Sequence, residues 1–61
     1  MNDEKVEIHG KLIAETNIAI LIDDGAFDVW LPKSQIKYNG EVGEECTIEM
    51  PDWLAYGKEL I

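Results

Sequence analysis

Apolar and polar residues alternate along several short stretches of this chain, which is the pattern of half-buried β-strands. The first stretch covers residues 5–14, where Val6, Ile8 and Leu12 share one face. Gly10 interrupts that face, as expected for a bulge or a tight bend in a curled sheet. The pattern therefore predicts a first strand that bends near its middle.

The next two stretches flank the dipeptide Asp24-Gly25 and predict a hairpin. Asp-Gly between β-rich segments favours a two-residue type I′ turn, because both central residues must tolerate positive φ. With this dipeptide as the loop, strands 18–22 and 27–31 pair so that one face forms a core ladder. The ladder has three pairs, namely Ile22 with Phe27, Ile20 with Val29 and Ile18 with Leu31.

The opposite face of the hairpin also carries apolar residues, since the same register places Leu21 and Trp30 there. A cover for them is expected from the C-terminal helix, from the curled sheet or from a second subunit. Sixty-one residues bury only about 60% of the surface of the unfolded chain, and a single cysteine allows no intrachain disulfide. Self-association is the remaining usual supplement, so we expect a homo-oligomer.

A turn and a fourth strand follow the hairpin. Pro32 ends the second hairpin strand because it has no N–H to donate, and residues 34–36 predict a short turn or one helical turn. Alternation resumes over residues 44–50, with Cys46 on the inward face. Cys46 is therefore predicted to be a small core residue rather than a reactive thiol.

A short helix is predicted at the C-terminal end. Asp52 is placed to cap it, with its carboxylate near the positive helix end, and Gly57 weakens or ends it. Trp53, Leu54 and Tyr56 are too large and apolar for a short helix to leave in solvent, so we expect all three to pack.

Together these elements predict one domain over residues 1–61, with residues 1–4 disordered. The fold class is mainly β (α+β), with four strands in a strongly curled antiparallel sheet or small barrel followed by a short C-terminal helix. The acidic first residues do not match a signal peptide, and no apolar run has the length of a membrane helix. A cytoplasmic protein without a membrane partner is expected.

Two tryptophan-containing blocks carry a family resemblance. They are Trp30-Leu31-Pro32-Lys33-Ser34-Gln35-Ile36 and Met50-Pro51-Asp52-Trp53-Leu54-Ala55. The chain resembles a family of small phage, prophage and bacterial proteins, most without an assigned function, and it departs from their pattern after Ala55. The resemblance implies a phage-associated accessory protein and supplies no active site.

Binding to a protein partner is the function that composition favours. Thirteen acidic and five basic residues give a net charge of −8, which suits steering toward a basic partner, and aromatic side chains suit anchoring. We predict a non-enzymatic accessory protein without a cofactor, possible targets being a host nucleic-acid enzyme or defence complex that it inhibits. The predicted binding residues are Trp30, Lys33, Gln35 and Trp53.

Two alternatives stay open. The first is an oligomeric single-strand nucleic-acid binder, with Trp30 as a stacking platform and Lys33 and Lys37 as basic contacts, although the net charge opposes phosphate binding. The order of strands then helix is also similar to that of dimeric single-strand-binding coactivators. The second is a metal-dependent activity at the acidic patch Asp23, Asp24 and Asp28, whose oxygens suit magnesium or calcium. The same aspartates also suit a solvated hairpin turn.

Overall fold

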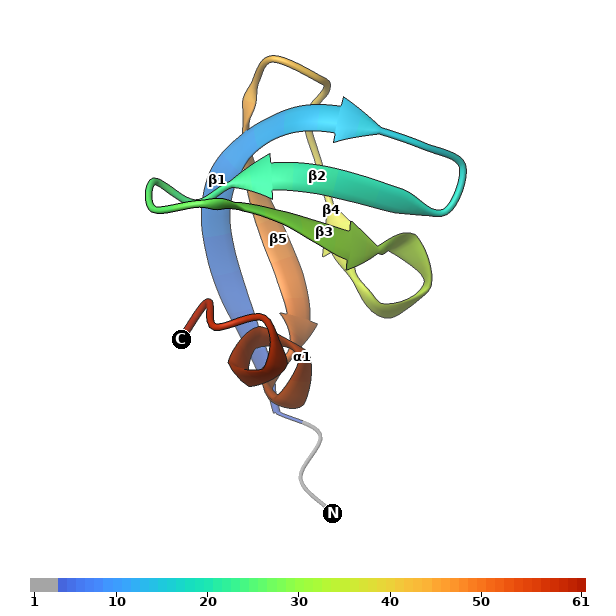
Figure 1. The fold of residues 1–61 in the computed structure, drawn as a ribbon. Helices are drawn as coiled ribbons and strands as arrows, with labels where there is room; N and C mark the ends of the chain where they lie inside the picture. Colours follow the sequence, from blue (N-terminus) through green and yellow to red (C-terminus); the bar gives the residue numbers. More distant parts are fainter. Residues whose placement is uncertain (1–3) are drawn as a thin grey trace.

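The computed structural model describes residues 4–61 and places five strands in one antiparallel sheet (Figure 1). The strands are β1 (Lys5–Glu15), β2 (Ala19–Asp23), β3 (Asp28–Pro32), β4 (Lys37–Tyr38) and β5 (Glu45–Pro51). A single 3-10 turn, η1 (Lys33–Gln35), follows β3, and the helix α1 (Asp52–Gly57) follows β5. The mainly β class and the short C-terminal helix are therefore confirmed.

The strand order is β3-β2-β1-β5-β4, with β3 and β4 at the two ends. These end strands do not pair with each other, so the sheet is open and the alternative of a closed small barrel is wrong. The predicted count of four strands is also wrong, because it omits β4. Two residues are too few to show an alternating pattern, and β4 is defined by its pairing with β5.

The central strand β1 is long and curved, and it pairs on both sides (Figure 1). Its first part pairs with β5, from Lys5 opposite Pro51 onward, and its second part pairs with β2. Gly10 lies where the two pairings meet, and a Cβ there would be 2.9 Å from the carbonyl oxygen of Asp23. The irregularity in the register of β1 with β2 falls between Leu12 and Ala14. Gly10 therefore permits a close approach of the two backbones, and the bulge lies after it in β1.

The core lies on one side of this curved sheet and is closed by α1, which packs against β5 and β1. It consists of Leu12, Ile20, Ile22, Val29, Leu31, Cys46, Ile48, Met50, Leu54 and Ala55. Cys46 is buried as predicted, and burial raises the pKa of its thiol. A protonated, enclosed thiol is a poor nucleophile.

The predicted hairpin register is wrong by two residues. Ile22 pairs with Val29 and Ile20 with Leu31, so the loop between the strands has four residues rather than two. A two-residue shift keeps every side chain on its predicted face, so four of the six predicted ladder residues, Ile20, Ile22, Val29 and Leu31, are buried in the core. Ile18 and Phe27, which the shorter loop placed in the core ladder, are 77% and 45% exposed.

The helix also differs from its prediction in two respects. Pro51 occupies the N-cap position without a side-chain hydrogen bond, and Asp52 is the first helical residue rather than the cap. Leu54 is buried as expected, but Trp53 and Tyr56 are 57% and 65% exposed. A helix of fewer than two turns packs on the core with one side only, and that side carries Leu54 and Ala55 rather than Trp53 or Tyr56.

Of the four N-terminal residues predicted to be disordered, residues 1–3 lie outside the described residues. The carbonyl oxygen of Glu4 accepts a hydrogen bond from the backbone N–H of Asp52 at 3.0 Å. This bond ties the start of β1 to the start of α1.

Candidate functional site

An apolar patch lies on the face of β1, β2 and β3 that points away from the core. Leu21 and Trp30 are direct cross-strand partners, and Ile13 is the extra residue of the bulge in β1, next to Ala14, which pairs with Leu21. Trp30 is 45% exposed and Ile13 37% exposed, whereas Leu21 is half-buried. We call these three residues the outer-face patch. Leu21 and Trp30 therefore lie on the face predicted for them. The helix α1 does not cover this face, because it packs against β1 and β5 on the core side of the sheet.

Two carboxylates border this patch on the same face. Asp23 pairs with Asp28 across β2 and β3, two residues along from the pair formed by Leu21 and Trp30. Like charges placed directly opposite one another destabilise a sheet. Lys11, the partner of Asp23 in β1, supplies one nearby positive charge. The outer-face patch therefore has an acidic border at the hairpin end.

The aspartates of the hairpin hold its four-residue loop. A carboxylate oxygen of Asp23 accepts a hydrogen bond from the N–H of Gly25 at 2.8 Å. Asp24 accepts from the N–H groups of Ala26 at 2.9 Å and Phe27 at 3.1 Å. These bonds lower the pKa of the Asp24 carboxyl, that from Ala26 contributing most. Within residues 4–61, no group of three or more metal-ligating side chains is placed to hold an ion. The turn accounts for Asp23 and Asp24, and these two with Asp28 do not form a metal-ligand set in the described residues.

The Asp24 carboxylate gives the hairpin an acid-sensitive contribution to stability. Because its pKa is lowered on folding, the contribution is full above the ordinary value of 3.8 and is lost as the pH falls through the folded value. Asp24→Asn keeps an acceptor oxygen without the charge, so we expect a smaller loss of melting temperature between pH 5 and pH 2 than in the parent. Melting curves by circular dichroism measure this difference. Equal pH dependence in the two proteins contradicts the assignment.

Lys33 is engaged in an ion pair. Its Nζ lies 2.6 Å from a carboxylate oxygen of Glu15, which also accepts a hydrogen bond from the Tyr38 hydroxyl at 3.1 Å. The hydrogen bond from Lys33 lowers the pKa of Glu15, and in turn Glu15 raises the pKa of Lys33. The positive charge of Lys33, the basic contact in the nucleic-acid alternative, is therefore paired with Glu15 in this structure, and the alternative stays a prediction.

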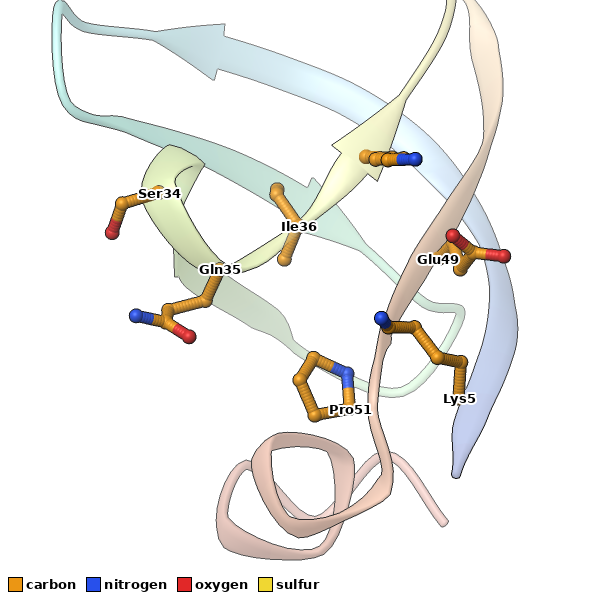
Figure 2. Close-up of a pocket in the computed structure, with 7 residues that line it drawn as sticks. Lys5, Ser34, Gln35, Ile36, Glu49 and Pro51 are labelled. Atoms are coloured by element: carbon orange, nitrogen blue, oxygen red, sulfur yellow. The ribbon is translucent and has the colours of Figure 1, made fainter. Parts of the chain in front are cut away.

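A groove lies between η1, β4, the end of β5 and the start of β1 (Figure 2). Its volume is about 250 Å³, and it is lined by Lys5, Ser34, Gln35, Ile36, Lys37, Glu49 and Pro51. Figure 2 shows the Lys5 side chain reaching toward the space between Ile36 and Pro51. Gln35, one of the predicted binding residues, therefore lines a concave surface.

The four predicted binding residues do not form one site. Trp30 belongs to the outer-face patch, Lys33 pairs with Glu15, Gln35 lines the groove, and Trp53 is exposed on α1. Sequence reasoning did not select Lys5, Glu49 or Pro51 for the groove. Nothing in their local sequence marks them, because only the pairing of β1 with β5 brings them together.

Comparison with protein-family models, with curated proteins and with solved structures finds no match for this chain. In the part of the chain that the structure covers, no helix has the length and apolar character needed to cross a membrane.

Proposed function

We propose that this protein is a binding module that docks onto a protein partner through the outer-face patch. The observation that carries the proposal is the pair of Leu21 and Trp30 on the face opposite the core, with Trp30 45% exposed. A half-exposed tryptophan beside a half-buried leucine resembles the aromatic anchors that dominate the energy of protein interfaces. Such anchors gain their energy when the partner excludes water from them.

The charge around the patch supports a basic partner. Asp23 and Asp28 border it, and the whole chain carries a charge of −8. A second copy would bring the same negative border to the same patch, whereas Lys or Arg side chains on a partner would relieve the repulsion between the two aspartates. The homo-oligomer predicted from chain length stays a prediction, and we assign the outer-face patch to a different protein.

The sharpest form of this proposal is a phage-type accessory protein that inhibits a host nucleic-acid enzyme or defence complex in the cytoplasm. The resemblance of the two tryptophan blocks to small phage and prophage proteins supports it. The binding groove of a nucleic-acid enzyme is basic, so an acidic module with an apolar anchor complements it in charge. The proposal requires no catalytic group in this chain.

The test uses a photo-crosslinking amino acid in place of Ile13, with a second protein labelled at Val42 as the control for general exposure. A partner crosslinked from position 13 is purified and titrated calorimetrically against the parent and the Trp30→Ser variant. We expect about thirtyfold weaker binding by Trp30→Ser, since truncating an anchor costs about 2 kcal/mol or more. Added salt should slow association.

Trp53→Ser is the matched control because Trp53 is also exposed but lies on α1. Its affinity for the purified partner should stay within about threefold of the parent. Melting curves show whether both variants fold. Loss of binding in Trp53→Ser with full binding by Trp30→Ser would overturn the proposal. It would also be overturned if mass spectrometry of the crosslinked product shows that position 13 crosslinks only to a second copy.

A further inference from the structure

The groove formed by η1, β4, β5 and β1 is lined by hydrogen-bond donors that have no partner within residues 4–61. Lys5 and Lys37 line it together with Ser34 and Gln35. Across residues 4–61 the ion pair within 4.0 Å is that of Lys33 with Glu15, and none of the four groove side chains takes part in a side-chain hydrogen bond. Within residues 4–61, the ammonium groups of Lys5 and Lys37 therefore remain free to donate to a ligand, whereas the Ser34 hydroxyl and the Gln35 amide point away from the space beside Lys5 in Figure 2.

The charge inside the groove is opposite to that of the whole molecule. Lys5 and Lys37 supply two positive charges, and Glu49, the cross-strand partner of Lys37, supplies the one negative charge among the lining residues. The groove is thus left with one positive charge on a chain whose net charge is −8. A ligand with a single negative charge balances it, whereas a dianion is repelled by the surrounding acids.

The floor of the groove is apolar. Ile36 and Pro51 are half-buried there, and in Figure 2 the Lys5 side chain extends over the space beside them. A volume of about 250 Å³ accommodates a small group rather than a cofactor. We infer that the groove binds a monocarboxylate with a short apolar body, the carboxylate accepting from Lys5 and Lys37 and the apolar body covering Ile36 and Pro51. This inference is independent of the outer-face patch.

The test is an NMR titration of the ¹⁵N-labelled protein with sodium butyrate at constant ionic strength. We expect saturable shifts of the backbone amides of residues 34–37 and of Lys5. Lys5→Gln with Lys37→Gln should weaken binding about tenfold or more. Glu49→Gln should strengthen it severalfold, because it removes the carboxylate that competes for both lysines.

Matched controls separate a site from general charge effects. Lys11→Gln with Lys58→Gln makes the same change in net charge outside the groove, so it should leave the butyrate affinity unchanged. Butyramide, which lacks the charge, and inorganic phosphate, which carries more of it, should give no saturable shifts at the same residues. The inference is overturned if butyrate shifts do not saturate, if both double variants bind equally, or if phosphate binds more tightly than butyrate.

Discussion

Gly10→Ala is expected to lower the free energy of unfolding by about 1–3 kcal/mol, the usual cost of forcing extra atoms into a packed interior. The new methyl group would lie 2.9 Å from the backbone oxygen of Asp23 and 3.4 Å from Cδ1 of Ile22. The close neighbour is backbone, so relief requires β1 and β2 to move apart where both pairings of β1 meet. Stability for 61 residues is roughly 3–9 kcal/mol, and urea unfolding monitored by circular dichroism should show the loss directly.

Gly57→Ala provides the control. It introduces the same methyl group at the end of α1, where nothing lies within 4 Å of the added Cβ. Alanine is the better helix former, so this variant should gain up to about 1 kcal/mol. Opposite signs for the two variants support the close approach at Gly10. A Gly10→Ala protein as stable as the parent would show that β2 does not lie where it is described.

Ile20→Ala is expected to lower the free energy of unfolding by about 2–5 kcal/mol, because it leaves a cavity that the surrounding core can fill only in part. Ile20 is fully buried and pairs with Leu31 in β3 and Glu15 in β1. In a chain this small the loss is a large share of the total stability, so much of the variant population should be unfolded at 37 °C. The fraction unfolded is read from a urea titration at 25 °C and from the melting curve.

Ile18→Ala is the same substitution two residues away and should change stability by less than about 0.5 kcal/mol. Ile18 is 77% exposed, although a two-residue hairpin loop would place it in the core opposite Leu31. The two variants therefore distinguish the observed register from the shorter loop. Comparable losses in both would favour the two-residue turn.

The alternating pattern predicted which residues face the core because a strand needs only its own sequence to define its two faces. Four of the five strands were found in this way, each within one or two residues of its bounds. The register of the hairpin was not, because Asp-Gly is compatible with more than one loop length. The carboxylate of Asp24 decides between them, since its bonds to the N–H groups of Ala26 and Phe27 hold the longer loop.

The candidate sites were predictable to different degrees. The outer-face patch follows from β2 and β3, which are neighbours along the chain, so Leu21 and Trp30 could be assigned to one face from their spacing. The groove joins Lys5 to Pro51 and Lys37 to Glu49, and these pairs depend on which strands become neighbours. Likewise, the pairing of Lys33 with Glu15 could not be predicted, because β1 and η1 are distant in sequence.

The position of β1 between β2 and β5 has a consequence for how the chain folds. Pairing with β2 needs only a short loop, whereas pairing Lys5 with Pro51 requires almost the whole polypeptide to close on itself. The entropy lost in loop closure rises with loop length, and distant contacts slow the rate-limiting step. The meander of β1, β2 and β3 can therefore nucleate early, while β5 and α1 add late and complete the cooperative unit.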